Sequence, residues 1–360
     1  QPPSIPQRHA LVMEGGRLRA RKNYAVCGGK TLGPYDFIGF IVSSSRRDRI
    51  AFRYSLGGRW YLYHDGSVSG PYDDVPEDPQ ISDNGKILVF RYRKNGRSYF
   101  AVEGKEFGPY DSPYVPAVTP GGRCALSYKK DGNNYFSIDG VEYGPWSFAQ
   151  RPVFSGSETS VACGIKKGWD AYLWFNGTEI GPYDRVGPPY MSHDGDSLGF
   201  TFIRDSKEHV WISGKAHGPY DRALGPIFTG LKRYPVFFRY KDGSGSYLNI
   251  GGKIHGPYGE VAFPAFSHDG SRFFFIFSRD KDYLCLDGKT YGPYQDLGGM
   301  YFSPDTARFS FWYKQGGRFY LNVEGTIHGP YGRAGEFRFA PGGGYGFNYM
   351  EGGSIFVHDR

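Results

Sequence analysis

Short runs of apolar residues alternate with turns rich in Gly, Asp and Asn along almost the whole chain. Residues 259–294 show the pattern clearly, because each apolar run there has the length of a strand and ends at turn-forming residues. The predicted strands are A (Val261–Ser267), B (Arg272–Phe277), C (Tyr283–Leu286) and D (Thr290–Tyr294), joined by turns at His268-Asp269-Gly270, Arg279–Asp282 and Asp287-Gly288. Strands in corresponding positions elsewhere in the chain carry the same letters.

This stretch is one copy of an internal repeat. Gly-Pro-Tyr occurs eight times and Gly-Pro-Trp once, at spacings of 36 to 38 residues, and another Gly lies four residues before each copy. The nine triplets begin at Gly33, Gly70, Gly108, Gly144, Gly181, Gly218, Gly256, Gly292 and Gly329. Four short strands with tight turns fill this period and leave no room for a helix. The sequence therefore predicts an all-β protein, a single β-propeller of four-stranded blades, with nine blades and eight or ten as alternatives.

The two ends of the chain decide the blade count. Strands of types C and D are predicted around Tyr24–Cys27 and Thr31–Tyr35, while Glu336–Ala340, Tyr345–Met350 and Ser354–His358 follow the last triplet. Joining both ends into one composite blade gives nine blades but leaves one C-type strand over, and a segment at residues 9–13 adds another candidate. We expect one domain over residues 1–360, with an N-terminal extension at residues 1–8.

Gly-Pro-Tyr fits the outermost strand of a blade. Pro cannot donate a hydrogen bond to a neighbouring strand, so it is tolerated at an edge, which also needs protection against stray pairing. Tyr would pack its ring and keep its hydroxyl in water. The alternative is that nine aromatic rings form a stacking platform for sugars or bases.

Some turns between strands A and B carry a known signature. Phe266-Ser267-His268-Asp269-Gly270-Ser271-Arg272, Phe302-Ser303-Pro304-Asp305 and Met191-Ser192-His193-Asp194-Gly195 resemble the Phe-Ser-Pro-Asp-Gly turn of bacterial TolB-type propeller repeats. The resemblance extends over nearly the whole chain and implies a blade type rather than a function. Val118-Thr119-Pro120-Gly121, Phe228-Thr229-Gly230 and Phe339-Ala340-Pro341-Gly342 depart from it because they lack the Asp.

Composition narrows the class of protein. Aromatic residues make up 18% of the chain, too many for a disordered protein, and no apolar run is long enough to span a bilayer. Cys27, Cys124, Cys163 and Cys285 lie far apart, which gives no support for zinc or redox motifs and favours ordinary thiols in strands. A start at Gln1 fits a mature end left by signal cleavage, so we expect an extracytoplasmic protein, periplasmic or secreted; a trimmed chain is the alternative.

No catalytic group or cofactor site is predicted. His217, His255 and His328 precede Gly-Pro-Tyr on three different blades, too far apart to converge on one metal ion. Ser192-His193-Asp194 and Ser267-His268-Asp269 are adjacent residues, whereas a catalytic triad needs side chains that converge from different elements. We therefore expect no cofactor and no enzyme activity.

The B–C turns carry more basic than acidic residues, and the net charge of the chain is +7. Asp follows Gly-Pro-Tyr in five copies on the same face of the blades, so these turns form either a ring of solvated ion pairs or a basic face for an acidic partner. The predicted partner-binding residues are Arg91, Arg93, Lys94, Arg97, Lys129, Lys130, Lys166 and Lys167.

Three functions are compatible with this sequence. The favoured one is a non-catalytic scaffold that presents a face or central channel to another protein or protein complex. The alternative is a repeat lectin that binds glycans in one aromatic pocket per blade, and the remote alternative is a hydrolase or lyase using the channel. No specific nucleic acid is expected, because the basic charge is mild and spread along the chain.

Overall fold

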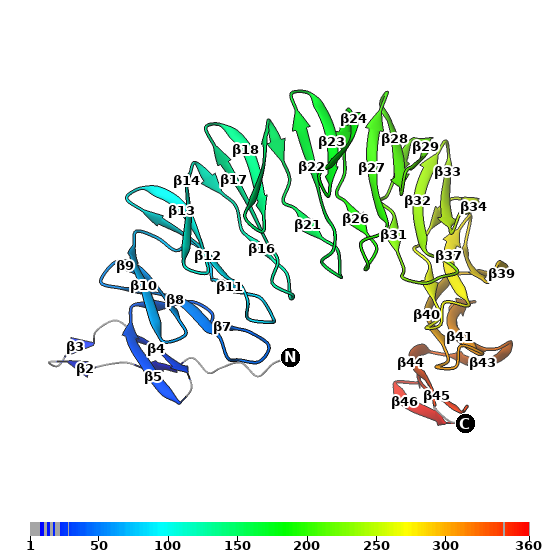
Figure 1. Ribbon diagram of the computed structural model, residues 1–360. Coiled ribbons are helices and arrows are strands. Elements are labelled where there is room, and N and C mark those ends of the chain that lie inside the picture. Colours follow the sequence, from blue (N-terminus) through cyan, green and yellow to red (C-terminus); the bar gives the residue numbers. More distant parts are fainter. Residues whose placement is uncertain are drawn as a thin grey trace. The chain divides into compact units, whose positions relative to one another are not determined.

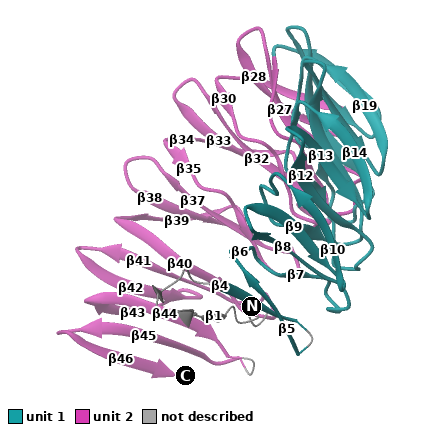
Figure 2. Ribbon diagram, turned by 90° about the vertical axis from the view of Figure 1, so that its left-hand side faces the viewer, with its two compact units in different colours: residues 1–184 teal, residues 185–360 magenta. Residues whose placement is uncertain are grey.

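The computed structural model describes residues 8–10, 13–14, 17–18, 22–27, 29–340 and 343–359, and these contain strands and no helix. The prediction of an all-β protein is therefore confirmed. The chain divides into two compact units, residues 1–184 and 185–360 (Figure 2). Except for Arg8, the predicted N-terminal extension lies outside the described residues, as do Pro341 and Gly342 of the last A–B turn.

The first unit contains the sheets of the N-terminal half. Its strands are β1 (Arg8–Ala10), β2 (Met13–Glu14), β3 (Arg17–Leu18), β4 (Lys22–Cys27), β5 (Lys30–Tyr35), β6 (Phe37–Ile38), β7 (Val42–Ser43), β8 (Ile50–Leu56), β9 (Arg59–His64), β10 (Ser67–Tyr72), β11 (Gln80–Ile81), β12 (Leu88–Lys94), β13 (Arg97–Val102), β14 (Lys105–Tyr110), β15 (Ser112–Pro113), β16 (Ala117–Val118), β17 (Cys124–Lys130), β18 (Asn133–Ile138), β19 (Val141–Trp146), β20 (Phe148–Ala149), β21 (Val153–Phe154), β22 (Val161–Lys167), β23 (Asp170–Phe175) and β24 (Thr178–Tyr183).

The second unit repeats the same pattern. Its strands are β25 (Arg185–Val186), β26 (Tyr190–Met191), β27 (Leu198–Arg204), β28 (Lys207–Ile212), β29 (Lys215–Tyr220), β30 (Arg222–Ala223), β31 (Ile227–Phe228), β32 (Val236–Asp242), β33 (Gly245–Ile250), β34 (Lys253–Tyr258), β35 (Glu260–Val261), β36 (Ala265–Phe266), β37 (Phe273–Ser278), β38 (Asp282–Leu286), β39 (Lys289–Tyr294), β40 (Asp296–Phe302), β41 (Phe309–Gln315), β42 (Arg318–Val323), β43 (Thr326–Tyr331), β44 (Arg333–Phe339), β45 (Tyr345–Glu351) and β46 (Ser354–Asp359).

Each complete sheet is an antiparallel blade in the order A, B, C, D, with the Gly-Pro-Tyr strand at its edge, as predicted (Figure 1). Strand A differs from the prediction. It is expected as one strand over Val261–Ser267, but β35 and β36 are two short pieces that both pair with β37, and five other blades show the same break. The break in this blade contains Pro264, which has no N–H to donate to the ladder.

The described residues form ten sheets of this type besides the hairpin β2–β3. Eight contain all four strand types. The sheets β1-β4-β5 and β44-β45-β46 at the two ends have three strands each. The count is therefore ten if every sheet is a separate blade, and nine if the terminal sheets share one blade. The shared blade remains a prediction.

The triplet has a specific backbone geometry. Each of the nine Gly-Pro bonds is cis, and the register between strands C and D shifts at this point. Gly108 has a φ of +130°, and a Cβ atom there would lie 3.0 Å from the carbonyl oxygen of Ser98 on strand C. Only Gly fits this conformation and this close approach. The first residue of the triplet is thus fixed by the backbone.

The aromatic residue of the triplet packs against the next blade. Tyr110 on β14 stacks on Tyr128 of the following strand B, with ring centroids 3.9 Å apart. The corresponding contacts are Tyr35–Tyr54 (4.2 Å), Tyr72–Tyr92 (4.3 Å), Tyr220–Tyr240 (4.0 Å), Tyr258–Phe277 (4.0 Å), Tyr294–Tyr313 (4.4 Å) and Tyr331–Tyr349 (3.9 Å). These rings are buried or half-buried, so they join blades and do not form a stacking platform.

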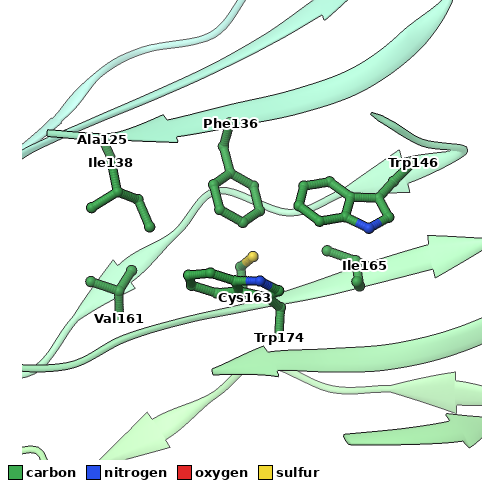
Figure 3. Packing of buried hydrophobic residues seen from close by; sticks show 8 residues of the cluster. All are labelled: Ala125, Phe136, Ile138, Trp146, Val161, Cys163, Ile165 and Trp174. Atoms are coloured by element: carbon green, nitrogen blue, oxygen red, sulfur yellow. The ribbon is translucent and has the colours of Figure 1, made fainter. Parts of the chain in front are cut away.

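The hydrophobic core of each unit lies between successive blades. In the first unit, Phe136 and Ile138 of one blade face Val161, Cys163 and Ile165 of the next. Figure 3 shows the Trp146 and Trp174 rings closing the same cluster, in which Phe136 and Ile165 have no exposed surface. Since burial of such side chains is the main stabilising term, each blade depends on its neighbour for its core.

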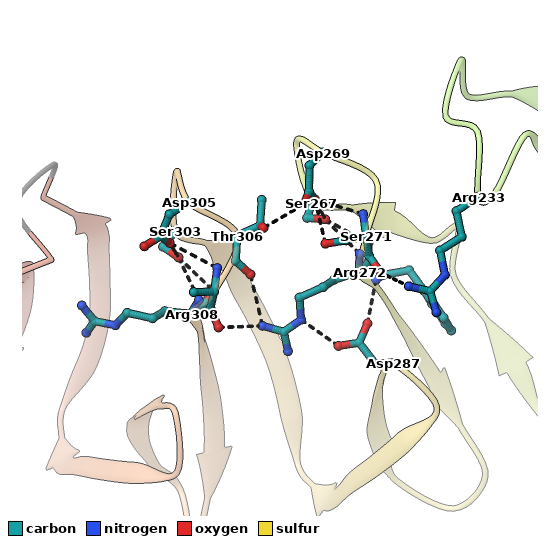
Figure 4. Close-up of polar contacts among 12 residues, drawn as sticks. Arg233, Ser267, Asp269, Ser271, Arg272, Asp287, Ser303, Asp305, Thr306 and Arg308 are labelled. Atoms are coloured by element: carbon teal, nitrogen blue, oxygen red, sulfur yellow. Dashed lines mark hydrogen bonds and ion pairs between the residues drawn. The ribbon is translucent and has the colours of Figure 1, made fainter.

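The TolB-like turns are held by a repeated set of hydrogen bonds (Figure 4). The Ser267 hydroxyl accepts a bond from the Arg272 N–H (3.0 Å) and donates to Asp269 Oδ1 (2.7 Å). In the next blade, the Thr306 hydroxyl donates to Asp269 Oδ2 at 3.0 Å. Ser and Asp of this turn therefore have structural roles, because they satisfy backbone groups and bridge two blades.

Arg272 adds a second bridge between the same blades. Its Nε lies 2.8 Å from Asp287 Oδ2 in the C–D turn of its own blade, and its Nη1 donates to the carbonyl of Ala307 in the next blade at 3.1 Å. Arg49, Arg123 and Arg308 occupy the corresponding positions and make the same two types of contact. Figure 4 shows this bridge beside the turn that it supports.

Candidate partner-binding surface

Three consecutive blades of the first unit present their B–C hairpins side by side. These are β12–β13, β17–β18 and β22–β23, and all eight predicted partner-binding residues lie on them (Figure 1). Their two-residue turns are Asn95-Gly96, Asp131-Gly132 and Gly168-Trp169. Asn95 and Asp131 have positive φ angles, as the tight turn of a two-residue hairpin requires.

The Asp that follows Gly-Pro-Tyr supports these turns. Asp73 Oδ2 accepts a hydrogen bond from the Gly96 N–H (3.1 Å), and Asp111 Oδ2 accepts one from the Gly132 N–H (3.3 Å). The hydrogen bond from the Gly96 N–H holds the pKa of Asp73 below its ordinary value, and the contact with the Arg59 guanidinium lowers it further. These carboxylates fix the hairpin tips, so part of the negative charge on this face has a structural use.

Arg91 differs from the other seven predicted residues. Its side chain is half-buried, its Nη2 lies 2.6 Å from Glu77 Oε2, and its Nη1 donates to the carbonyl of Pro113 in the next blade. These contacts join blades within the protein. We therefore leave Arg91 out of the surface proposed below.

Two lysines turn toward the edge strand of their own blade. Lys130 Nζ lies 4.0 Å from Glu142 Oε1, and Lys167 Nζ lies 2.5 Å from Glu179 Oε2. Both pairs are about half exposed, so they restrict these side chains only weakly. Within the described part of the chain, the remaining five predicted residues make no ion pair. They are Arg93, Lys94, Arg97, Lys129 and Lys166.

The most exposed large apolar side chain in the described residues lies at the tip of the third hairpin. Trp169 is 95% exposed and follows Lys166, Lys167 and Gly168 directly in the chain. The sequence reasoning missed it, because it evaluated the B–C turns by their charges alone. A signal was present: Gly168-Trp169 stands where the other two hairpins have Asn-Gly and Asp-Gly.

Four B–C tips in other blades are arranged differently. There a basic residue pairs with a carboxylate from the strand or crossover beside it, whereas Arg279 and Lys281 at the β37–β38 tip make no ion pair among the described residues. The pairs are Arg59–Asp73 (2.6 Å), Lys207–Asp221 (2.5 Å), Lys241–Glu260 (2.5 Å) and Arg318–Glu351 (2.7 Å). The ring of solvated ion pairs therefore describes these four tips, whereas the three hairpins named above carry unpaired positive charge and, on the third, an exposed indole.

The histidines singled out in the sequence have packing roles. His217, His255 and His328 lie on strand D of three blades and contact an aromatic ring of the next blade. The ring centroids are 5.5 Å apart for His217–Phe238 and 5.3 Å apart for both His255–Phe275 and His328–Phe347. Burial lowers the pKa of His217 and His255.

The possible metal ligands and the cysteines also form no reactive cluster among the described residues. Among the described residues, no three His, Cys, Asp or Glu side chains are placed to hold a metal ion. Cys27, Cys124, Cys163 and Cys285 are free and buried on strands, and burial raises the pKa of Cys124 to about 12. In the part of the chain that can be described, no helix has the length and apolar character to cross a lipid bilayer.

Comparison with known proteins gives weak structural matches. No family model and no curated protein matches the chain. TolB from Acinetobacter baumannii aligns at 16% identity over 54% of this chain, and the chain spans just over half of that structure (56%), with a TM-score of 0.29. The β-propeller domain of the Trilobed protease from Pyrococcus furiosus aligns at 13% identity over 71% of this chain and 96% of its own, with a TM-score of 0.31. The Dos1 propeller aligns at 11% identity over 80% and 90%, with a TM-score of 0.32.

These structures contain propellers, the class that the four-stranded sheets of this chain also define. At such TM-scores the superpositions carry no argument about function. The blade assignment rests on the strand order A, B, C, D, on its repetition and on the edge position of Gly-Pro-Tyr.

Proposed function

We propose that this chain is a non-catalytic, exported interaction protein that binds an acidic protein through the tips of β12–β13, β17–β18 and β22–β23. The observation that carries the proposal is the 95% exposure of Trp169 beside Lys166 and Lys167. A large aromatic side chain is costly to leave in water, and Trp is enriched among the residues that dominate binding energy in protein interfaces.

The surrounding charge indicates the chemistry of the partner. Arg93, Lys94, Arg97, Lys129 and Lys166 would attract an acidic surface and accelerate its encounter with the tips. Trp169 would then enter an apolar pocket of the partner and slow its release. The two parts of the surface thus have separate kinetic roles, because charges at a rim change mainly the on-rate and a buried anchor changes mainly the off-rate.

The test is a pull-down from the native source followed by binding kinetics. Wild-type protein should recover an acidic protein at low salt, Trp169→Ser should release it faster, and reversing the charges of Arg93, Lys94 and Arg97 should slow its association. The charge effect should shrink at high salt, because the Debye length is about 8 Å at physiological ionic strength. Lys207→Glu is the matched control, since Lys207 lies on a paired tip outside the proposed surface.

Three outcomes contradict the proposal. Equal recovery of the same proteins by wild type and both variants would show that the tips do not bind. Avid binding to a glycan array that the tip variants leave unchanged would favour the lectin. Recovery of the native protein from the cytoplasmic fraction would contradict export.

We also propose that the chain is one propeller domain whose terminal sheets share a blade. Ile355 and Val357 on β46 are 70% and 71% exposed, whereas the corresponding Leu321 on β42 has no exposed surface. A shared blade would close the propeller and place another blade against this face, which would bury both side chains as β44 and β45 bury Leu321. Val357→Ser should then lower the free energy of unfolding by about 1 kcal/mol or more, and an unchanged value would contradict the shared blade.

A further inference from the structure

Three arginines occupy the same position in three blades. Arg53, Arg91 and Arg239 lie on strand B, and each pairs in register with a residue of strand C. The Nη1 of each donates to a backbone carbonyl of the next blade, always 22 residues further along the chain: Val75, Pro113 and Val261 respectively. The backbone contact of the three guanidinium groups is therefore equivalent.

Two of these arginines also hold a carboxylate. Arg53 Nε lies 2.9 Å from Asp78 Oδ1, and Arg91 Nη2 lies 2.6 Å from Glu77 Oε2. Asp78 follows Arg53 by 25 residues, and Glu77 precedes Arg91 by 14 residues. A charged guanidinium that is partly removed from water gains most from such a planar, charge-assisted pair.

Arg239 has neither carboxylate. The residue 25 positions after it is Pro264 and the residue 14 positions before it is Gly225. No ion pair of Arg239 occurs among the described residues. Its Nε is buried without a hydrogen-bond partner, as is the Nε of Arg91, which meets its carboxylate through Nη2. The guanidinium carbon lies 4.0 Å from the centre of the Phe263 ring, which fixes the orientation of the group. Burial lowers the pKa of Arg239, and the charge of nearby Glu260 acts in the opposite direction without cancelling this effect.

A cavity of about 230 Å³ lies beside this guanidinium. It is lined by residues on or beside β30, β32, β33 and β35, and these strands all belong to the second unit (Figure 2). Arg222 and Lys241 add positive charge to its wall, and Leu224 and Val261 add apolar surface. The one acidic residue in the wall, Glu260, lies 2.5 Å from Lys241 Nζ. The cavity thus combines a guanidinium group without an ion pair, net positive charge and apolar walls, which are the properties of a site for a small anion.

We propose that this cavity binds the carboxylate of a ligand, which pairs with Arg239 as Asp78 and Glu77 pair with Arg53 and Arg91. The volume admits a carboxylate attached to a short aliphatic or single-ring body. The shared chemistry is the carboxylate, and it has two sources: a free organic acid, or an acidic side chain of a peptide. The site is independent of the hairpin tips, which lie in the other unit.

The experiment follows the Arg239 Nε–Hε resonance by NMR at constant ionic strength while sodium benzoate, sodium propionate or a short Glu-containing peptide is added. We expect a saturable shift with a free acid, and sodium chloride should produce none. Arg239→Gln should weaken binding at least about tenfold when it is measured by calorimetry. Arg53→Gln is the matched control, because that guanidinium already has its carboxylate, and it should leave the affinity unchanged.

Pro264→Asp keeps the test decisive if Arg239→Gln folds poorly. This variant supplies a carboxylate at the position of Asp78, so it should abolish binding of the acid and raise the unfolding temperature. Saturation by the peptide alone would identify an acidic side chain as the source. Absence of saturable binding by every probe, or equal affinity of the wild-type and Pro264→Asp proteins, would overturn the proposal.

Discussion

The ring of Tyr110 lies flat against the ring of Tyr128, with centroids 3.9 Å apart, and joins the edge strand of one blade to the second strand of the next. Tyr128 in turn stacks on Tyr135 of its own strand C at 6.0 Å. The edge triplet, which the sequence suggests is a protective device, is therefore also the main aromatic contact between blades.

Removing this ring should destabilise the protein. Tyr110→Ala is expected to lower the free energy of unfolding by about 2–4 kcal/mol, because a half-buried aromatic side chain and its stacking partner lose their contact. Tyr110→Phe should cost less than about 1 kcal/mol. Urea denaturation measures both, with Tyr114→Ala as the control, since Tyr114 is 44% exposed. Equal stability of Tyr110→Ala and the control would show that the stack contributes nothing.

Two glycines of one blade should differ in how much a substitution destabilises the protein. Gly108→Ala places a Cβ atom 3.0 Å from the Ser98 carbonyl oxygen at a φ of +130°, and should cost about 1–3 kcal/mol. Gly104, with a φ of +75° and no atom within 4 Å of its Cβ position, should accept Asn with a change within about 0.5 kcal/mol. Thermal unfolding of the two variants makes the comparison, and a larger loss for Gly104→Asn would refute the account of the triplet.

Stability should fall in alkaline solution. Burial, and then neighbouring tyrosines, raise the pKa of Tyr35, Tyr220 and Tyr294 to about 12, compared with about 10 in an unfolded chain. Because the folded-state pKa is the higher one, this contribution is complete below about pH 10 and is lost as the pH rises toward 12. Denaturant midpoints measured from pH 8 to pH 12 should therefore decrease, and the triple Phe variant should flatten the decrease. A midpoint that is constant to pH 12 would contradict the burial of these hydroxyls.

The bridge made by Arg272 should be specific to the guanidinium group. Arg272→Ala removes the contacts with Asp287 and with the Ala307 carbonyl, and should cost about 1–2 kcal/mol. Arg272→Lys should not restore the loss, because one ammonium cannot reach both acceptors with the same geometry. Lys232→Ala, at an exposed position, serves as the control in the same urea titration. Full recovery by Lys would show that charge alone is responsible.

The sequence predicts most of the blade and less of what joins blades. Strands B, C and D follow from the alternation of apolar runs and turn residues, and Asp287-Gly288 forms the predicted hairpin with both φ angles positive. The break in strand A escapes the pattern, since an apolar stretch with one proline reads as continuous. Contacts such as Tyr110 with Tyr128 depend on which residues of neighbouring blades face each other, and this is information that a repeat period does not contain.

The sequence also predicts only part of the candidate surface, because it does not show which charged side chains are exposed. Counting charges located the basic hairpins correctly, but it could not distinguish Arg91, which points between blades, from Arg93, which is exposed. Trp169 was missed because a residue at a turn is usually evaluated for its backbone preference, whereas here its exposed side chain is the informative property. Which charged side chains form ion pairs depends on the arrangement of the strands in the folded protein, and the sequence does not give this arrangement directly.

The recurring contacts between blades have an evolutionary consequence. The stacked aromatic rings, the Asp at the crossover and the Arg bridge each connect one repeat to the next through the same positions of the period. Duplication or deletion of one whole period would therefore create a junction whose contacts already exist elsewhere in the chain. We therefore expect such a protein to tolerate the gain or loss of a whole blade better than the gain or loss of part of one.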